Sequence, residues 1–306
     1  MFGEELSRVR TRYGQFHIAK RDSVIGLSLQ RYGEWGEHEI SVLSEFVEEG
    51  DGFIIDVGAN IGTHAAGFAA RFSAMTVIAC EPNPLAYCLL VTNMVVNGYS
   101  NVQPLQIACG ARSKIIRVPL ASDGSDEERW NLGAASFLEN SQGTRSASKQ
   151  TATVPVSVVA LDSLVIAKRV KLIKIDVEGA ESAVLAGARS LISRDRPVIF
   201  FEVLSMENMR SCRTVLDSLD YKLSWLETTQ FNENNYNGFD VNLWSKTEMG
   251  VIAVPNERKQ AIPLPPVKDS EDQIPYMHGK NARWNELVGD GFTITSDLDV
   301  DCATDD

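Results

Sequence analysis

Long apolar runs are absent from this sequence of 306 residues. No uninterrupted stretch approaches the roughly 20 apolar residues that a helix needs to cross a bilayer. The first residues, Met1-Phe2-Gly3-Glu4-Glu5, also lack the basic and then apolar order of a secretory signal peptide. We therefore expect a cytoplasmic protein without membrane insertion.

Paired cysteines are missing as well. The chain has five cysteines, an odd number, and none of them shows the C-x-x-C spacing of a zinc clasp or a redox site. A disulfide framework is therefore not expected, and most of these residues should be small members of the core. The five positions are Cys80, Cys88, Cys109, Cys212 and Cys302.

Positive charge is scarce. The chain has 29 Lys and Arg against 41 Asp and Glu, which gives a formal net charge of −12. This balance argues against tight nonspecific binding of nucleic acid, because such binding depends on neutralising phosphates with basic side chains. From Ala261 onward there are three basic and ten acidic residues, a net charge of −7. We expect no nucleic-acid partner, although this reasoning concerns the tail more than the first 260 residues.

Apolar residues make up 44% of the chain, which is enough for one large core. From about Gly52 to Val203, short apolar runs alternate with longer helical patterns, as is typical of a mostly parallel sheet covered by helices. We expect an N-terminal segment over residues 1–50 that could act as a lid, a main domain over 51–258 and a flexible acidic tail over 259–306. The proline-rich run from Ile262 to Pro266 predicts a stiff linker to that tail.

Individual elements follow from the same patterns. The stretch from Ala121 to Gln150 is rich in Ser, Gly, Asn and charge, which indicates a long surface excursion. Strands are expected at 53–55, 76–80, 102–109, 154–159, 171–175 and 197–203, with a closing pair at 221–226 and 251–254. Helices are expected over 63–72, from Pro84 to a terminating Gly98, along the stripe Val184, Ala188, Leu191 and Ile192, and over 206–219.

The strongest local motif is the loop after the first of these strands, Asp56-Val57-Gly58-Ala59-Asn60-Ile61-Gly62. Glycines let the backbone turn sharply and approach a ligand, and the helix beginning near Gly62 offers free amide groups. A dinucleotide site uses G-x-G-x-x-G so that the backbone can touch a pyrophosphate. Asn60 occupies the second glycine position here. The motif therefore favours a ligand such as S-adenosylmethionine (SAM), which has no pyrophosphate and whose cationic sulfonium suits Asp56.

A second acidic residue, Glu81, ends the next strand 25 residues after Asp56. A carboxylate at this point can accept both ribose hydroxyls of a nucleoside that lies across the strand ends. The alternative is that the glycines merely shape a turn and that Glu81 caps a helix. The predicted cofactor-binding set is Asp56, Gly58, Asn60, Gly62, Glu81, Pro82 and Ala108.

Two more carboxylates, Asp176 and Glu178, follow directly on the apolar strand 171–175. They face the same crevice as Asp56 and Glu81, where a substrate would meet the cofactor. The alternative for Glu178 and for Glu181 is that they favour a helix N-terminus by their charge.

Several of these motifs together resemble the FkbM family of SAM-dependent methyltransferases. The resemblance spans about Tyr32 to Pro255, and its most specific part is the string from Ile173 to Glu181. It implies a Rossmann-like class I methyltransferase fold, an α/β architecture with a central, mostly parallel seven-stranded sheet, helices on both faces and an antiparallel closing strand. It also implies methylation of a hydroxyl oxygen on a sugar, a glycan or a secondary metabolite. The matching strings are Asp56-Val57-Gly58-Ala59-Asn60-Ile61-Gly62, Cys80-Glu81-Pro82-Asn83, Leu161-Asp162-Ser163-Leu164 and Ile173-Lys174-Ile175-Asp176-Val177-Glu178-Gly179-Ala180-Glu181, with Tyr32-Gly33-Glu34-Trp35 and Gly133-Ala134-Ala135-Ser136-Phe137 as less distinctive flanks.

Methyl transfer to a hydroxyl also needs a group that takes up the proton. Asp176 and Glu178 are the first candidates, and His64 is a third because imidazole titrates near neutral pH. His38 could reach the site only if the N-terminal segment folds over it. A divalent metal would require Asp176, Glu178 and Glu202 to converge, which the sequence does not show, and we expect none.

Specificity is expected outside the sheet, in the segments Gly36 to Val47, Ala121 to Gln150 and Thr228 to Asn242, whose aromatic rings could stack on a sugar or anchor the loops. The acceptor would be a small molecule or a carbohydrate. The rival interpretations are an NAD-dependent oxidoreductase, which would share the ribose-binding acid, and a non-catalytic SAM-binding scaffold. The sequence leaves the acceptor, the base and the oligomeric state open.

Overall fold

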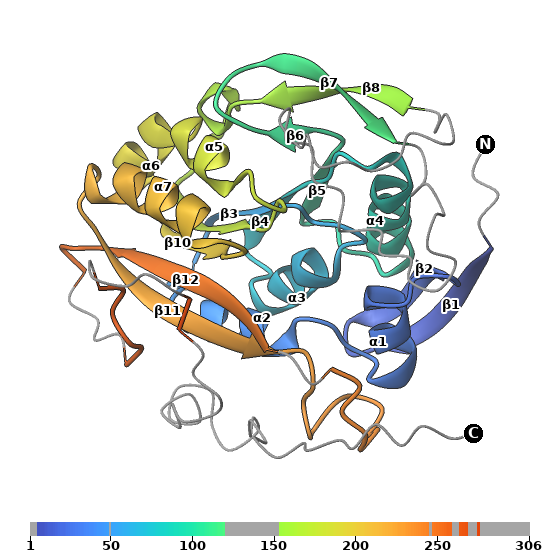
Figure 1. Cartoon of the computed structure of the whole chain (residues 1–306). Helices are drawn as coiled ribbons and strands as arrows, with labels where there is room; N and C mark the ends of the chain where they lie inside the picture. The colour runs from blue at the N-terminus through green and yellow to red at the C-terminus, as the bar shows by residue number, and fades with distance from the viewer. Residues whose placement is uncertain are drawn as a thin grey trace, which may run out of the picture.

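A seven-stranded sheet forms the centre of the computed structural model, which describes residues 5–48, 50–119, 153–244, 247–258, 263–268 and 274–275. The strand order is β11-β12-β10-β9-β3-β4-β5 (Figure 1). Neighbours from β10 to β5 are parallel, and β12 lies antiparallel between β10 and β11. This is the expected Rossmann-like sheet with its antiparallel closing strand. The strands are β3 (Gly52–Val57), β4 (Met75–Cys80), β5 (Val102–Leu105), β9 (Val170–Ile175), β10 (Val198–Glu202), β11 (Tyr221–Thr229) and β12 (Thr247–Pro255).

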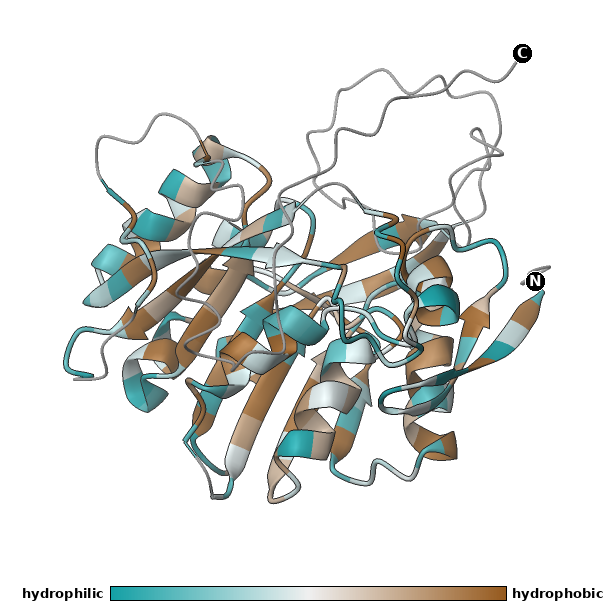
Figure 2. Cartoon of the chain, turned by 90° about the horizontal axis from the view of Figure 1, so that it is seen from below, coloured by the Kyte–Doolittle hydropathy of each residue, from teal (hydrophilic) through white to brown (hydrophobic). Residues whose placement is uncertain are grey.

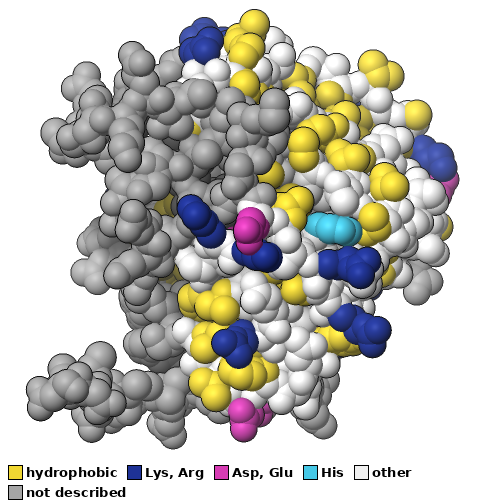
Figure 3. Space-filling view, turned by 90° about the vertical axis from the view of Figure 1, so that its right-hand side faces the viewer, with side chains coloured by type: hydrophobic (Ala, Val, Ile, Leu, Met, Phe, Trp, Pro, Cys, Tyr) yellow, Lys and Arg dark blue, Asp and Glu magenta, His cyan; other side chains and the backbone are white. Residues whose placement is uncertain are grey.

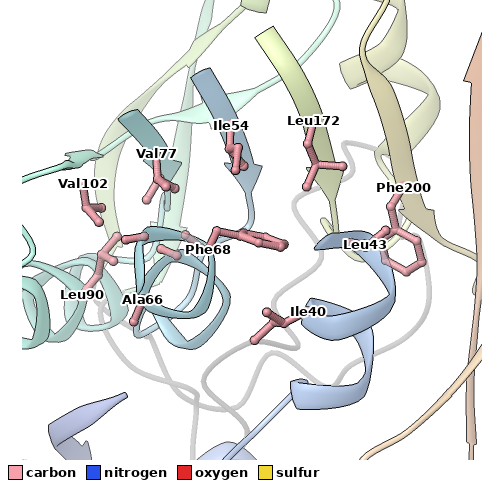
Figure 4. Close-up of a cluster of buried hydrophobic side chains, with 14 of the residues drawn as sticks. Ile40, Leu43, Ile54, Ala66, Phe68, Val77, Leu90, Val102, Leu172 and Phe200 are labelled. Carbon is pink, nitrogen blue, oxygen red and sulfur yellow. The ribbon is translucent and has the colours of Figure 1, made fainter. Parts of the chain in front are cut away.

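Helices cover both faces of this sheet. Successive strand residues point to opposite faces, so Ile54 belongs to one buried cluster and Ile55 to the other. Under α1 to α4, Phe68 and Leu43 face a row of apolar side chains from five neighbouring strands (Figure 4). Under α5 to α7 lies the second cluster, and the strands between the two layers are largely hydrophobic (Figure 2). The helices are α1 (Ile25–Arg31), α2 (Glu37–Ser44), α3 (Thr63–Arg71), α4 (Pro84–Val96), α5 (Glu181–Ala186), α6 (Arg189–Asp195) and α7 (Met206–Asp217).

An N-terminal hairpin, β1 (Leu6–Thr11) and β2 (Gly14–Ala19), packs against α4. The His17 amide donates to the Asn93 side chain at 2.7 Å, and the Asn93 amide donates back to the His17 carbonyl at 3.2 Å. On this face of the molecule Lys and Arg predominate over Asp and Glu among the described side chains (Figure 3). The net negative charge of the chain is therefore not spread evenly.

The predicted strand 102–109 is wrong as a single element. β5 ends at Leu105 and belongs to the central sheet, whereas β6 (Ala108–Cys109) joins a separate small sheet with β7 (Lys114–Pro119) and β8 (Thr153–Val159). The chain turns between them, since the Ile107 amide donates to the Leu105 carbonyl at 3.0 Å. The predicted excursion from Ala121 to Gln150, with the string at 133–137, lies outside the described residues.

The helix predicted along the stripe from Val184 to Ile192 is also divided. α5 and α6 are separate helices, although all four stripe residues are buried as expected. The break lies at Gly187, where a Cβ would come within 2.1 Å of the Gly110 carbonyl oxygen. Close packing of the backbone against the small sheet therefore interrupts the periodic pattern. A short 3-10 turn, η1 (Leu161–Ser163), lies nearby and contacts α6.

The segment 263–268 lies along the edge strand β11, where the sequence indicates a linker. The Trp225 amide donates to the Pro265 carbonyl at 2.8 Å, and the Val267 amide donates to the Leu223 carbonyl at 3.0 Å. The prolines fit this outermost position because an edge residue can do without its amide hydrogen. Most of the acidic tail beyond lies outside the described residues. Within the part of the chain that the structure describes, every helix is too short or too polar to cross a bilayer.

Candidate functional site

The glycine loop between β3 and α3 is built by close backbone approach. Gly58 has φ +83°, and a Cβ there would lie 1.8 Å from the Asp176 carbonyl oxygen. Asn60 is also left-handed, with φ +50°, and Gly62 with φ +95° precedes the first turn of α3. The loop therefore runs directly past the chain that follows β9, so that two of the predicted motifs meet.

Glu81 holds this loop in place. One carboxylate oxygen accepts a hydrogen bond from the Asn60 amide at 2.9 Å, and the other accepts from the Asn83 amide at 2.7 Å. Burial raises the pKa of Glu81 to about 7, against the opposing effect of these two amide donors. Each carboxylate oxygen can accept a second hydrogen bond, so Glu81 can organise the loop and still bind ribose hydroxyls. Pro82 and Ala108, the other two predicted positions, are partly buried after Glu81 and in β6.

A row of charged side chains extends along the carboxyl ends of four strands. Asp56 is the register partner of Lys174, and Asp176 follows Lys174 by two residues. Because Phe200 is the register partner of Lys174, Glu202 lies on the same face of the sheet. Glu248 of β12 continues the row. Gly250 is the register partner of Glu202, and Glu248, two residues before Gly250, lies on the same face of the sheet.

Lys174 lies at the centre of this row. Its side chain is 2% exposed, and its ammonium nitrogen is 3.1 Å from Asp176 Oδ2 and 3.6 Å from Asp56 Oδ1. Burial would lower the pKa of Lys174, but the charges of Asp176 and Asp56 outweigh it and raise the pKa. Burial also raises the pKa of Asp56, and the charge of Lys174 opposes that shift.

Asp176 connects the buried row to the surface. Its side chain is 38% exposed, whereas that of Asp56 is completely buried. Desolvation would raise the pKa of Asp176, but the charge and hydrogen bond of Lys174 lower it overall. The neighbouring Glu202 carboxyl hydrogen-bonds to Asp176, and burial followed by the Asp176 charge raises the pKa of Glu202 well above its ordinary range. Asp176 is therefore ionised and Glu202 protonated near neutral pH.

Glu178 has the properties of a proton acceptor. Its backbone is left-handed, with φ +55°, in the turn before α5. Such a conformation in a residue other than glycine is costly and is often found at functional sites. Burial, followed by the charges of Asp176 and Glu181, raises the pKa of Glu178 to about 7. Glu181 itself accepts hydrogen bonds from the Val177 and Gly179 amides, so it organises the turn before α5.

The structure brings His64 close to the charged row. His64 Nε2 is 3.0 Å from Glu39 Oε1 of α2, a contact without the geometry of a hydrogen bond. Gly36 allows this approach, because a Cβ there would lie 2.4 Å from His64 Cε1. His64 is therefore placed in the site by the N-terminal segment as well as by α3.

The N-terminal segment and the predicted loop 228–242 are hydrogen-bonded to each other. His38 Nδ1 accepts from the Thr229 amide at 3.3 Å, and burial lowers the pKa of His38 to about 4. Glu34 accepts from the Asn232 side chain at 2.8 Å and from the Tyr236 amide at 3.0 Å. A neutral His38 and the carboxyl group of Glu34 thus connect the N-terminal segment to the loop.

The aromatic rings of that loop differ in position. Phe231 and Phe239 pack against Tyr32, with ring centroids 5.6 and 6.0 Å away. Tyr236 is 44% exposed. The first two rings therefore anchor the loop, and Tyr236 is the ring that a ligand could still reach.

A metal centre is not formed by the side chains that the structure describes. Among them no group of three or more His, Cys, Asp or Glu residues has an arrangement suited to a metal ion. The set considered from the sequence, Asp176, Glu178 and Glu202, therefore does not converge as metal ligands.

Three members of the site escaped prediction from the sequence. Glu39 follows the flanking string 32–35 and Glu248 lies far from every motif, and only tertiary contacts bring either of them to the row. Burial raises the pKa of Glu248 to about 8, and the Gln230 amide donates a hydrogen bond to it. Lys174 did carry a signal, because a lysine that interrupts the buried strand Leu172–Ile175 must have a partner.

Comparison with known sequences finds related proteins. Residues 56–223 match the family described as the methyltransferase FkbM domain. The chain is 29% identical over 147 residues to Methyltransferase 1 of Beauveria bassiana (strain ARSEF 2860), which covers 45% of the chain and 58% of that protein. It is 29% identical over 163 residues to Methyltransferase sdnD of Sordaria araneosa, which covers 44% of the chain and 60% of that protein. The chain thus spans roughly three fifths of the length of these curated relatives.

Solved structures show a more distant likeness. The chain is similar to methyltransferase FkbM from Methylobacillus flagellatus KT, with a TM-score of 0.43 and 18% identity, over 70% of this chain and 47% of that one. It is also similar to an SAM-dependent O-methyltransferase from Thermotoga maritima, with a TM-score of 0.42 and 15% identity, over 83% of this chain and 79% of that one. At these scores neither likeness bears on the acceptor or on the site residues.

Proposed function

The chain belongs to the FkbM methyltransferase domain family, an SAM-dependent family, and from this premise we propose that it methylates a hydroxyl oxygen of a sugar, a glycan or a secondary metabolite. Family membership decides against the NAD-dependent oxidoreductase considered from the sequence. The observation that supports oxygen as the acceptor is Glu178, a carboxyl group with a pKa of about 7 that directly follows Asp176 and Val177, the two residues next to Gly58 of the glycine loop. A neutral hydroxyl is a poor nucleophile, and a base whose pKa lies near the working pH is the most effective help.

The residues around the loop fit SAM. Both carboxylate oxygens of Asp56 and the side-chain oxygen of Asn60 are buried without a hydrogen-bond partner among the described residues. Buried acceptors are normally satisfied, so these oxygens suit a ligand that brings donors and positive charge. We assign Asp56 and Asn60 to the methionine part of SAM and Glu81 to its ribose, with Gly58 and Gly62 giving the backbone room to approach.

We assign the chemistry to the residues after β9. When bound, SAM supplies a methyl group from its sulfonium sulfur. Glu178 would accept the proton of the acceptor hydroxyl as its oxygen took the methyl group, and the sulfur would leave as the neutral thioether of S-adenosylhomocysteine. Asp176, ionised and partly exposed, accepts a hydrogen bond from the acceptor and orients it. His64 is the second candidate for the proton, since it lies in the same site, in contact with Glu39.

The proposal is tested by following labelled methyl groups from SAM into fractions of neutral glycans and hydroxylated metabolites. Glu178→Gln keeps the shape of the side chain but removes the base, so the rate of label transfer should fall about 100-fold or more. The wild-type rate should rise with pH through about 7, because Glu178 acts in its ionised form. Glu207→Gln, at an exposed position of α7, is the matched control. Label found only in amine nitrogen, or an unchanged rate in Glu178→Gln, would contradict the assignment.

A further inference from the structure

Lys174 is buried, and its ammonium group lies close to two carboxylates. Its ammonium nitrogen contacts Asp176 at 3.1 Å and Asp56 at 3.6 Å, and the Asp56 side chain has no exposed surface. We call these three residues the triad. With both carboxylates ionised, the triad has a net charge of −1. Without the lysine, two neighbouring carboxylates would repel each other and share a proton.

The triad adjoins the cofactor loop on two sides. Asp56 ends β3 just before the loop, and the Asp176 carbonyl oxygen occupies the space where a Cβ of Gly58 would lie. The charge of the triad therefore acts on whatever the loop binds. SAM and its product S-adenosylhomocysteine differ by one methyl group and by the positive charge on sulfur. A site of fixed negative charge distinguishes them by that charge.

We propose that Lys174 is a positioning residue that keeps the net charge of the triad at −1 and thereby sets the preference of the site for SAM over S-adenosylhomocysteine. This inference rests on the proposed placement of SAM at the loop. The negative triad attracts the cationic donor and not the neutral product, and the lysine limits this attraction by cancelling one of the two carboxylate charges. A lysine with a purely structural role would affect the binding of both molecules equally.

Other titratable groups face the triad and contribute to the same field. These groups are present in the wild type and in the variants alike. The effect of Lys174 is therefore measured as the difference in the ratio of dissociation constants between variant and wild type at the same pH. These groups are Glu39 of α2, His64 of α3, Glu81 after β4, Glu178 before α5, Glu202 of β10 and Glu248 of β12.

The test is the ratio of dissociation constants for S-adenosylhomocysteine and SAM, measured by calorimetry on the full chain from about pH 6 to about pH 9. In Lys174→Met the two carboxylates share a proton at low pH, which leaves a charge of −1 and a ratio close to that of the wild type. As the pH rises this proton is lost and the charge becomes −2. The ratio should then exceed the wild-type ratio at least about tenfold.

Two further variants keep the test informative if Lys174→Met does not fold. Asp176→Asn brings the triad to a net charge of zero, so the ratio should fall about tenfold below that of the wild type. The double variant Lys174→Met/Asp176→Asn leaves Asp56 as the only charge of the triad, so at the high-pH end, where Asp56 is ionised, the charge is −1 and the ratio should return to that of the wild type. Asp176→Asn keeps Lys174 as the partner of the buried Asp56, which favours folding of that variant.

Lys171→Met is the matched control. Lys171 lies at the other end of the same strand, where it donates to the Glu48 carbonyl at 2.9 Å. This variant should bind both molecules like the wild type. If Lys174→Met or Asp176→Asn weakened the two ligands by the same factor at every pH, Lys174 would be merely structural and the inference wrong. A wild type that binds neither ligand would instead contradict the placement of SAM itself, and a failure of the Glu178 test alone would leave the triad untouched.

Discussion

One face of the central sheet has two halves that are chemically opposite. Within two residues, each of three neighbouring strands changes from an apolar to an ionisable side chain. The apolar side chains add to stability in proportion to the surface they remove from water. The ionisable ones must find partners to offset their lost hydration. The pairs are Ile54 and Asp56 in β3, Leu172 and Lys174 in β9, and Phe200 and Glu202 in β10.

The two halves therefore have different roles. The apolar half fastens α2 and α3 to the sheet (Figure 4). The ionisable half places charge beside the cofactor loop, at the ends of parallel strands where open α/β sheets bind ligands. We expect substitutions in the first half to act on folding and those in the second to act on binding and on pH dependence. Three substitutions test this division.

The largest effect is expected in the apolar half. Phe200 is 2% exposed and packs in the cluster beneath α2. Phe200→Ala should lower the free energy of unfolding by about 3–5 kcal/mol, since it removes a buried ring and leaves a cavity. Urea denaturation measures this loss. The affinity of the folded fraction for SAM should stay near that of the wild type. A large loss of affinity with little loss of stability would contradict the expectation that the apolar half acts on folding and not on binding.

The next effect belongs to the ionisable half. Glu81→Ala removes the group that we assign to the ribose and that also receives the Asn60 amide. Affinity for SAM should fall by about 1.5–3 kcal/mol, which is typical of hydrogen bonds to a charged group and corresponds to about 10-fold to 150-fold. Calorimetric titration measures it, with Glu207→Ala as the control. Unchanged affinity would show that the ribose binds elsewhere.

The smallest effect is a change in the pH dependence of stability. Burial and the Asp176 charge raise the pKa of Glu202 above its ordinary value of 4.5. The folded protein therefore keeps a proton that the unfolded chain releases, and stability is lost as the pH rises above that value. Glu202→Gln removes this loss. Between about pH 5 and about pH 6 the stability of the variant relative to the wild type should therefore increase by up to about 1.4 kcal/mol. If the free energy of unfolding varied with pH in the same way for the wild type and for Glu202→Gln, Glu202 would be ionised in the folded state.

Much of this architecture was predictable from local pattern. The core strands, the cofactor loop and the cap of α4 all follow from short stretches of sequence, and Asn83 does accept hydrogen bonds from the Leu85 and Ala86 amides. The errors arose where distant backbone intervened. Gly187 packs against Gly110 and divides a helix, and the chain after Leu105 leaves one sheet for another.

The residues of the site also fall into a group that the sequence could predict and a group that it could not. Asp56, Glu81, Asp176 and Glu178 stand in motifs, so their types and spacing could be interpreted from the sequence alone. Their roles as SAM ligands, orienting group and base stay predictions that the substitutions above test. The partners of these residues were not predictable, because a pairing between strands depends on register and not on proximity in the chain.

By itself the sequence determined the fold class, the glycine loop and the family, since alternating apolar runs and a glycine motif express short-range physics. Only the tertiary structure decided that Lys174 faces Asp56, that Glu39 reaches His64 and that Glu34 ties the N-terminal segment to the loop around Asn232. The ionisation of a buried carboxyl group depends on every charge within several ångströms. Those charges come from strands and helices that are far apart in the sequence and that only folding brings together.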